Sequence, residues 1–453
     1  MTEFLTAGEA ARRLGVKPAT LYAYVSRGLL HRDKAADGRG SLFDPDEVEQ
    51  LARRGRPRRP AGVVDITVES AITQISAGRL RYRGLDAAGL AASRSFEDVA
   101  ELLWTGELGA SPGARQAAPS APWQPAPSAP WQATPAALEV GRGAQAALPA
   151  GTLPLERLQV IVPAMATTDP LRLHLDPQAV CAAGRSIIAG LVDCLPPAAP
   201  VPDHPVPDHP APDLSALDHP APDYPDPDNP IVDRLWSRLR GGRPSPALLR
   251  ALSAALVLLA DHELAASTLA ARAAASVRAD PYAVVQTGMA AVSGALHGGA
   301  TLGAELMLAA ASGPDDAPRV LGELLRRGEH IPGFGHFAYP GGDPRAVLLL
   351  GLVRRAAPKS GLLAVADAVL AEARRKSLPE PNIDFAVATL ARVAGMVPGA
   401  GEAVFAVART AGWIAHALRS TQAAVRYVPE LSTPACLRSS THDAVAVCYR
   451  FVT

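Results

Sequence analysis

The feature that most constrains the fold is a long stretch of apolar residues that recur at helical spacing. The stretch begins near Ile231 and continues to about Val428, and alanine, leucine and valine dominate it. Aromatic residues make up 5% of the chain, so the core is built from small side chains that let helices approach closely. The 453 residues are enough for two or three domains. The pattern therefore predicts an all-α protein with a sizeable core.

Neither charge nor hydropathy points to a particular partner. The 44 basic residues equal the 44 acidic ones, and the N-terminus lacks the charged and then apolar pattern of a signal peptide. The longest apolar stretch, residues 288–313, contains His297 and Glu305. A buried helix with a turn at Gly298 and Gly299 explains this stretch better than a membrane span. We therefore expect a cytoplasmic protein that does not contact a membrane.

Residues 1–60 form a separate small unit. Thr6 is a plausible N-cap and Glu9 completes a capping box, so we expect a helix that starts here and ends at Gly15. A second short helix follows directly. Two short helices joined by a glycine-containing turn are typical of a helix-turn-helix. The segment resembles the winged helix-turn-helix of MerR-type regulators, with residues 41–51 as the following strand and helix.

The composition of this small unit is compatible with DNA binding. It holds 12 Lys and Arg residues against 8 Asp and Glu residues, and basic side chains contact phosphates. The side chains expected on or near the recognition helix are Lys17, Thr20, Tyr22, Tyr24 and Arg27. The alternative is a module that keeps this fold and serves as a packing or protein-interaction element.

Two proline-rich segments interrupt the helical pattern. Residues 109–135 contain the heptapeptide A-P-S-A-P-W-Q twice, and residues 195–230 repeat P-D-H-P and P-D-Y-P. Regularly spaced prolines favour an extended chain, so we expect both segments to be surface insertions. The second segment contains three histidines, but its prolines do not let ligands converge on an ion. We therefore predict no metal site at His204, His209 and His219.

A turn-rich loop, residues 331–345, carries the first functional signal. Its sequence is I-P-G-F-G-H-F-A-Y-P-G-G-D-P-R, and its glycines and prolines prevent a helix or strand. An imidazole at His336 and a guanidinium at Arg345 on such a loop favour an anionic ligand with a carbonyl group. An isolated loop histidine is more often structural. Three further polar residues, however, interrupt the apolar background, namely His262, His297 and Asp384.

These residues lie in segments that resemble the citrate synthase family, in the same order and at similar spacing. The resemblance covers residues 63–108 and 232–428 and implies the family's all-α fold. It implies a large helical domain of residues 63–293 and 399–453, a small helical domain of residues 294–398 with catalytic residues, and a homodimer. The segments that carry it are D-H-E-L-A-A-S-T (261–268), A-L-H-G-G-A (295–300), P-G-F-G-H…D-P-R (332–345), P-N-I-D-F (381–385), A-R-T-A-G-W-I-A-H (408–416), S-A-I-T…G-R-L-R-Y-R-G (70–84) and S-F-E-D-V-A-E-L-L-W-T-G-E-L (95–108).

The resemblance also implies a reaction and a role for each polar residue. The family removes a proton from the methyl group of acetyl-CoA, adds the resulting enol to the ketone of oxaloacetate, and hydrolyses citryl-CoA to citrate. By matching motifs, Asp384 is the expected base, His297 stabilises the enol, and His336 protonates the ketone oxygen. Acetyl-CoA is a co-substrate, and we expect no cofactor and no metal. The residues expected to bind oxaloacetate are His262, Arg345 and Arg409.

Two features depart from the family's pattern. Basic residues usually follow the histidine of the loop, whereas residues 337–340 contain none. The family also carries an arginine that reaches the partner subunit's site, and Gln422 stands in the matching stretch here. Loss of an arginine that binds a substrate carboxylate weakens the binding of oxaloacetate or changes which keto acid the protein prefers as acceptor. A basic run before P-N-I-D either meets the phosphates of CoA or forms a solvated helix end, and it consists of Arg374, Arg375 and Lys376.

The residues leave three functions open. The first is condensation of acetyl-CoA with oxaloacetate. The second is use of propionyl-CoA to make 2-methylcitrate, because one extra methylene is a matter of pocket volume. The third, from a different class, is a DNA-binding regulator whose synthase-like body senses a metabolite. The helix-turn-helix and the missing arginine favour the regulator, although Arg419 and Arg426 are candidates to replace that arginine. The retained catalytic residues favour an enzyme.

Overall fold

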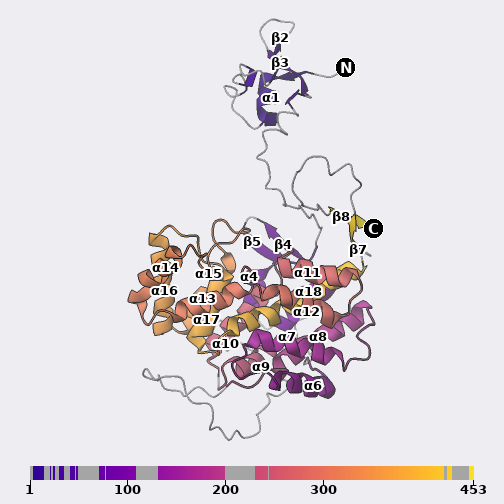
Figure 1. The fold of residues 1–453 in the computed structure, drawn as a ribbon, viewed down its shortest axis with the longest axis vertical. Helices are drawn as coiled ribbons and strands as arrows, with labels where there is room; N and C mark the ends of the chain where they lie inside the picture. The colour runs from indigo at the N-terminus through magenta and orange to yellow at the C-terminus, as the bar shows by residue number, and fades with distance from the viewer. Residues whose placement is uncertain are drawn as a thin grey trace. The chain divides into compact units, whose positions relative to one another are not determined.

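The chain divides into a small N-terminal unit, mainly Met1–Val68, and a large unit that begins at Glu69 (Figure 1). The structure is a computed structural model. It describes residues 4–14, 21, 24–25, 30–34, 41–45, 47–48, 71–76, 78–108, 131–198, 230–242, 244–422, 426–430 and 448–452.

The small unit combines a helix with a short antiparallel sheet. Strand β1 (Leu5–Thr6) leads into α1 (Ala7–Leu14), and β3 (Ser41–Phe43) pairs with both β1 and β2 (Asp33–Lys34). The expected capping box is present, because the Thr6 N–H donates to the Glu9 carboxylate over 2.9 Å and the Glu9 N–H donates to the Thr6 hydroxyl over 3.4 Å. The buried side chains of this unit are Ala10, Ala11, Leu21, Leu30, Phe43 and Val48. The residues predicted to bind DNA, Lys17, Thr20, Tyr22 and Arg27, lie outside the described residues.

The large unit opens with a ribbon of short strands and continues as helices. Strands β4 (Thr73–Ser76), β5 (Arg79–Tyr82) and β6 (Leu85–Asp86) form an antiparallel sheet in that order. A second pair, β7 (Arg426–Glu430) and β8 (Cys448–Val452), follows the helices. The helices around the central part of the unit are α4 (Ala87–Ser93), α5 (Phe96–Thr105), α6 (Pro135–Ala146), α7 (Pro154–Ala166), α8 (Pro177–Cys194), α9 (Ile231–Leu239), α10 (Pro246–Leu259), α11 (Ala266–Ser276), α12 (Pro281–Val292) and α18 (Ala400–Gln422).

Short polar side chains set where several of these helices begin. Ser95 and Asp98 form a capping box at the start of α5. The Asp176 carboxylate accepts from two backbone N–H groups at the start of α8, and the Asp280 carboxylate accepts from the N–H of Ala283 at the start of α12. A proline follows each of these two aspartates, at a position where the missing N–H costs nothing.

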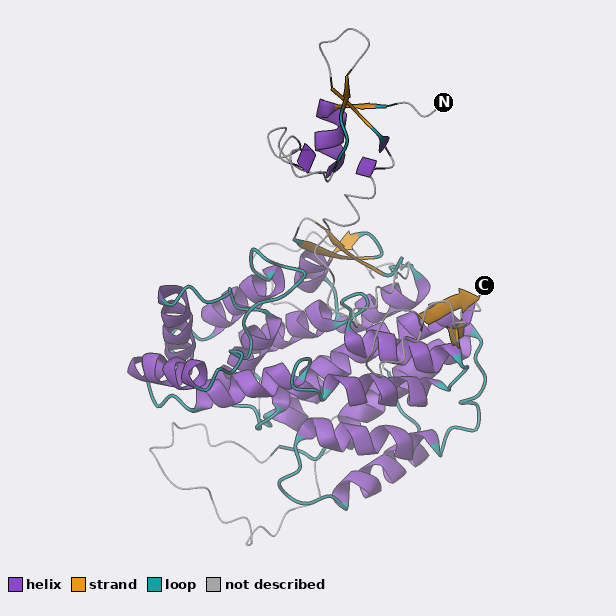
Figure 2. Cartoon of the chain, turned by 45° about the horizontal axis from the view of Figure 1, so that its top comes forward, coloured by secondary structure: helices purple, strands orange, loops and turns teal. Residues whose placement is uncertain are grey.

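The large unit is built mostly of helices (Figure 2), and helix α18 lies near its middle (Figure 1). It contacts α5, α8, α10, α11 and α12, and Ala403, Ala406, Ala408 and Ala411 on it are fully buried. Small side chains on a central helix allow neighbouring helices to approach it closely, as the composition predicted. The helical architecture agrees with the all-α expectation.

A second group of helices packs at one end of the large unit. It lies on the left of Figure 1 and consists of α13 (Gly299–Ala309), the short helix η2 (Pro314–Asp316), α14 (Ala317–Arg326), α15 (Pro344–Ala356), α16 (Gly361–Arg375) and α17 (Ile383–Ala394). Helices α13 and α17 of this group also contact α18. Residues 293–298 between α12 and α13 are not helical, so the apolar stretch from residue 288 breaks earlier than expected. The limits of the large and small domains stay a prediction.

At their C-terminal end, residues 109–135 do not form the extended surface segment that their prolines predict. Trp131 is buried and stacks on Trp104, with ring centroids 5.3 Å apart. Its carbonyl accepts from Nη2 of the buried Arg234 over 2.8 Å, and Thr134 caps α6. A single large aromatic side chain buries enough surface to order its surroundings despite a low-complexity composition. The preceding part of the segment lies outside the described residues.

The described residues lack two kinds of feature. No helix among them is long and apolar enough to cross a membrane. No group of three or more His, Cys, Asp or Glu side chains within the described ranges is arranged to hold a metal ion. The three histidines of the second proline-rich segment, His204, His209 and His219, lie outside those ranges.

Candidate active site

A pocket of about 520 Å³ in the large unit brings together all six residues that the sequence assigned to catalysis and oxaloacetate binding. They come from the end of α10, the turn before α13, the loop before α15, the start of α17 and the middle of α18. The six residues are His262, His297, His336, Arg345, Asp384 and Arg409. The rest of the lining combines apolar side chains, among them Leu296, Phe337 and Phe405, with His330 and Asn382.

The turn-rich loop is held against the start of α17 by backbone hydrogen bonds. The N–H of Gly335 donates to the carbonyl of Glu380 over 2.8 Å, and the N–H of Asn382 donates to the carbonyl of Gly333 over 2.9 Å. Gly333 has φ +81°, and a Cβ there would lie 2.8 Å from Cβ of Phe385. Glycine is therefore required by both conformation and space. These contacts place the loop beside the helix that carries the predicted base.

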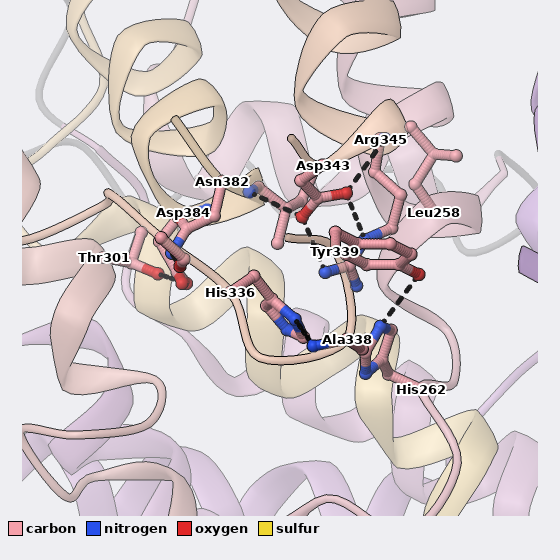
Figure 3. Close-up of polar contacts among 12 residues, drawn as sticks. Leu258, His262, Thr301, His336, Ala338, Tyr339, Asp343, Arg345, Asn382 and Asp384 are labelled. Atoms are coloured by element: carbon pink, nitrogen blue, oxygen red, sulfur yellow. Dashed lines mark hydrogen bonds and ion pairs between the residues drawn. The ribbon is translucent and has the colours of Figure 1, made fainter. Parts of the chain in front are cut away.

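Asp384 lies in the first turn of α17. The Asn382 side chain caps the helix by accepting from the Asp384 N–H over 2.9 Å. The hydroxyl of Thr301, on α13, donates to Oδ1 of Asp384 over 2.7 Å (Figure 3). Burial raises the pKa of Asp384 to about 6, although the Thr301 hydrogen bond opposes the rise. The carboxylate is therefore ionised at neutral pH and more basic than an ordinary aspartate.

His336 is a neutral imidazole whose tautomer follows from its contacts. The backbone N–H of Ala338 donates to Nδ1 of His336 over 3.1 Å, so Nδ1 is an acceptor and Nε2 carries the proton. Burial and the nearby Arg345 lower the pKa of His336 to about 4. The ring can therefore donate a hydrogen bond from Nε2 without carrying a positive charge.

His262 packs behind His336 and is held by a tyrosine. Nε2 of His262 and Oη of Tyr339 lie 3.0 Å apart, and the two histidine rings meet edge to face with centroids 4.9 Å apart. Burial holds the pKa of His262 well below its ordinary value, and the charge of Arg345 lowers it further. Tyr339 also lies under the Arg345 guanidinium, 5.3 Å from Cζ to the ring centroid, and its ring centroid is 5.0 Å from that of His336. One tyrosine therefore supports three predicted site residues.

The segment before His262 is anchored by a buried carboxylate. Asp261 accepts from the Thr73 hydroxyl over 2.5 Å and lies 3.3 Å from Nε2 of His416. The Tyr82 hydroxyl donates to the carbonyl of Asp261 over 3.1 Å. The ribbon strands β4 and β5 therefore fix the end of α10, and with it the position of His262.

His297 lies in the turn that precedes α13. Its Nε2 is 2.8 Å from the hydroxyl of Ser267, the second residue of α11. The imidazole meets the ring of Phe405 edge to face, with centroids 5.6 Å apart. Burial lowers the pKa of His297 to about 4, and Arg409 contributes to the fall. This imidazole is neutral as well.

The two predicted substrate-binding arginines differ in their partners. Nε and Nη2 of Arg345 donate to the Asp343 carboxylate over 3.0 and 2.8 Å. Burial alone would lower the pKa of Arg345, but Asp343 raises it above its usual value. Asp343 also accepts from the N–H of Ile383 over 3.0 Å. The charge of Arg345 is therefore compensated within the protein.

Arg409 forms no such ion pair within the part of the chain that the structure describes. Its Nε donates to the carbonyl of Leu259 over 2.7 Å, and its guanidinium lies 4.7 Å from the centroid of the Phe405 ring. Its Nη1 is buried and has no hydrogen-bond partner among the described residues. Burial lowers the pKa of Arg409. A buried cation with an unused donor that lines a pocket is suited to an anionic ligand.

The structure does not bring the predicted CoA-binding residues to this pocket. Arg374 and Arg375 end α16 and Lys376 follows, and all three are exposed. Arg375 pairs with Glu372, and Nζ of Lys376 lies 3.3 Å from the same carboxylate. None of the three lines the pocket. Their role at the phosphates of CoA stays a prediction.

Comparison with known proteins identifies the family. A sequence profile described as "Citrate synthase, C-terminal domain" matches residues 62–428, which is most of the chain. This chain belongs to the citrate synthase family. A second profile, described as "Helix-turn-helix domain", matches residues 4–56.

Relatives in the citrate synthase family match over different shares of their length. Citrate synthase 2 of Bacillus subtilis is 36% identical over 195 residues, which cover 42% of this chain and 51% of that protein. The chain thus matches about half the length of several curated relatives. A citrate synthase of Acidithiobacillus ferridurans is 30% identical over 373 residues, which cover 77% of this chain and 88% of that protein.

Solved structures share the fold. Citrate synthase from Pyrobaculum aerophilum superimposes with a TM-score of 0.60 at 23% identity and covers 83% of this chain and 91% of its own. A ternary complex of carboxymethyl coenzyme A and oxaloacetate with the Thermoplasma acidophilum citrate synthase gives a TM-score of 0.57 at 21% identity, and it covers 78% of this chain and 90% of its own. The all-α citrate synthase fold expected from the sequence is confirmed.

Three supporting residues were missed by the sequence reasoning. Asp343 and Tyr339 belong to the loop motif that carried the resemblance, and the sequence D-P-R gave a signal for an acid beside Arg345. Thr301 gave no signal, because its contact with Asp384 joins residues 83 positions apart. Gln422 stands where the family carries an arginine, and residues 423–425, which follow it, lie outside the described residues.

Proposed function

We propose that this chain condenses an acyl-CoA with oxaloacetate, and that acetyl-CoA yields citrate and CoA. The observation that supports this most strongly is the composition of one pocket. It combines a carboxylate of raised pKa, three neutral imidazoles and two guanidinium groups. These are the groups that an enolisation followed by addition to a keto diacid requires.

The first step is removal of a proton from the α-carbon of the thioester. Asp384 takes this proton, because its carboxylate is ionised at neutral pH and more basic than usual. The electrons of the C–H bond move toward the thioester oxygen, and the neutral His297 donates a hydrogen bond to that oxygen. Since Nε2 of His297 faces Ser267, Nδ1 is the nitrogen that serves the ligand.

The second step forms the carbon–carbon bond. The enol carbon attacks the ketone carbon of oxaloacetate, and His336 donates its Nε2 proton to the ketone oxygen. A neutral donor is available because the Ala338 N–H fixes the tautomer and burial prevents ionisation. Attack of water on the thioester then releases CoA and citrate.

The charge of oxaloacetate is matched chiefly by Arg409. Arg345 is already neutralised by Asp343, whereas Nη1 of Arg409 has no partner among the described residues. His262 adds a neutral imidazole at the same end of the pocket. We propose that Arg409 binds one carboxylate directly, and that Arg345 contributes through the guanidinium nitrogen that Asp343 leaves available.

The assembly that we propose is a homodimer, which light scattering on the purified protein tests. A molar mass near twice 47.0 kDa supports the dimer. A mass of one chain contradicts it.

Thiol release from acyl-CoA in the presence of oxaloacetate tests the proposed reaction. We expect turnover with the wild type and its loss in Asp384→Asn. The matched control is Asp367→Asn, which removes an exposed carboxylate that pairs with Arg354. Parallel assays with acetyl-CoA and propionyl-CoA decide between citrate and 2-methylcitrate. Absence of turnover with both thioesters, in a folded protein, contradicts the proposal.

A second candidate function is DNA binding by residues 4–56, which the helix-turn-helix match favours. In this case the pocket senses a keto acid or an acyl-CoA. A gel-shift assay with the DNA upstream of the protein's own gene tests it, with scrambled DNA of equal length as control. The variant Lys17→Ala with Arg27→Ala should lose the shift. An equal affinity for both DNAs contradicts sequence-specific binding.

A further inference from the structure

The side chain that holds the Asp384 carboxylate is Thr301. Among the residues that the structure describes, Thr301 is the one side chain that donates a hydrogen bond to this carboxylate, over 2.7 Å to Oδ1 (Figure 3). Thr301 is fully buried, so water does not compete for its hydroxyl. A threonine that only needed to fill space would leave its hydroxyl on a backbone carbonyl of its own helix, as Thr389 does on α17.

Packing around Thr301 leaves its rotamer little freedom. A Cβ placed on Gly401 would lie 2.5 Å from Cγ2 of Thr301 and 2.6 Å from Oε1 of Glu305. The absence of a side chain at Gly401 therefore allows α18 to press directly on the Thr301 methyl group. A β-branched residue whose methyl group is packed against a neighbouring backbone has few χ1 values open to it, and here the hydroxyl points at Asp384.

Helix α13 is itself anchored where α18 begins. Glu305 lies one turn beyond Thr301, and its carboxylate accepts from the N–H groups of Gly399 and Gly401 over 2.9 and 2.7 Å. These are donors that the start of α18 would otherwise leave without a partner. The anchor prevents α13 from rotating and so fixes the distance between Thr301 and Asp384.

We propose that Thr301 is a positioning residue for the catalytic base. It binds Oδ1 of Asp384 and thereby directs Oδ2 toward the α-carbon of the acyl-CoA. The inference rests on the proposed condensation for its catalytic consequence, but its effect on the carboxylate does not depend on turnover.

The hydrogen bond has a second consequence for the charge of the base. Donation to a carboxylate favours the ionised form, so Thr301 lowers the pKa of Asp384 while burial raises it. The other charged groups that act on Asp384 are Arg345 and Asp343 of the loop and Arg409 of α18. None of these changes when Thr301 is replaced, so a shift in the titration of Asp384 reports on Thr301.

The first measurement is an infrared titration of Asp384 in the wild type and in Thr301→Val, which keeps the shape and removes the hydroxyl. The carboxylic acid band that is missing from Asp384→Asn identifies the residue. We expect the midpoint in Thr301→Val to rise by about one pH unit, and Thr301→Ser to restore the wild-type value. The control Thr389→Val removes an equally buried hydroxyl from the helix of Asp384 and should leave the midpoint unchanged.

The second measurement is the pH profile of kcat. In Thr301→Val we expect the acid limb to move upward by the same amount and kcat above it to fall about tenfold, with KM for oxaloacetate unchanged. Thr301→Ser should recover most of the rate. An unchanged midpoint in Thr301→Val overturns the proposal, as does a fall in kcat that Thr301→Ser and Thr389→Val share. A shifted midpoint without turnover in any protein would overturn the proposed reaction and leave the Thr301 contact established.

Discussion

The pocket and the C-terminal end of α16 both carry basic residues that the sequence assigned to a ligand, yet their surroundings differ. In the pocket, Arg345 and Arg409 are buried, and each is held by a backbone or side-chain acceptor. At the end of α16, Arg375 and Lys376 are exposed and share the carboxylate of Glu372. A buried cation must have hydrogen-bond acceptors or an opposite charge beside it, because burial removes its water. An exposed cation can pair with any nearby acid, and the pair adds little to stability.

The two buried arginines also differ from each other. Arg345 is neutralised by Asp343, which ties the loop to α17 through Ile383. Arg409 has a donor without a partner among the described residues. One arginine therefore stabilises the site and the other is available to a substrate, which a comparison of their variants can test.

The largest expected effect is on stability, from Arg345→Met. This change leaves the Asp343 carboxylate buried without its partner, so we expect a loss of about 3–5 kcal/mol in the free energy of unfolding. Urea denaturation measures it. The double variant Arg345→Met with Asp343→Asn removes both charges, and we expect it to recover most of the loss. Equal destabilisation of the single and double variants would show that the pair is not the cause.

The next effect is on substrate binding, from Arg409→Met. Removal of the unpaired cation should raise KM for oxaloacetate about 100-fold, which corresponds to a charge-assisted contact of a few kcal/mol. Unlike the Arg345 variant, it should not destabilise the fold, because it removes a buried charge that lacks a carboxylate partner. Arg409→Lys keeps the charge but not the planar donor, so its KM for oxaloacetate should lie between those of the wild type and Arg409→Met. A KM that stays at the wild-type value would remove Arg409 from the binding site.

A smaller effect, on the free energy of unfolding, is expected from replacing Asp384 in the same pocket. The pKa of Asp384 rises on folding from 3.8 to about 6, so the folded protein binds this proton more tightly. The proton on Asp384 stabilises the fold fully when the pH is below the pKa of the unfolded state. This stabilisation is lost as the pH rises through the pKa of the folded state. Asp384→Asn should therefore be inactive yet more stable than the wild type at neutral pH, by about 3 kcal/mol at most. Thermal unfolding at acidic and neutral pH measures the difference, which should disappear at acidic pH.

The sequence predicted the residues of the pocket but not the contacts that hold them. His297, His336 and Asp384 stand out because polar side chains interrupt an apolar, alanine-rich pattern, and their motifs resemble a known family. Thr301 sits inside an apolar helix and becomes visible only when α13 and α17 are placed side by side. Local patterns report which residues are unusual for their surroundings, whereas partners far apart in sequence depend on packing.

The fold shows the same division between local and long-range information. The capping box of Thr6 and Glu9 was predicted from sequence, because a cap acts on N–H groups two or three residues away. Trp131 was assigned to an insertion, because proline and alanine surround it. Its contacts with Trp104 and Arg234 decided otherwise, and neither residue is near it in the chain.

The smallest expected effect belongs to the exposed end of α16. Replacing Arg374, Arg375 and Lys376 by Gln should raise KM for acyl-CoA about threefold at low ionic strength and not at all at high salt, because exposed charges are screened. Glu372→Gln is the matched variant, since it frees Arg375 and Lys376 from their shared carboxylate and should lower KM instead. A tenfold or larger rise that persists at high salt would mean that these residues hold the CoA phosphates as firmly as the pocket holds its own charges. The pocket and the end of α16 would then differ in how their basic residues are held before substrate binds, but not in how strongly they bind it.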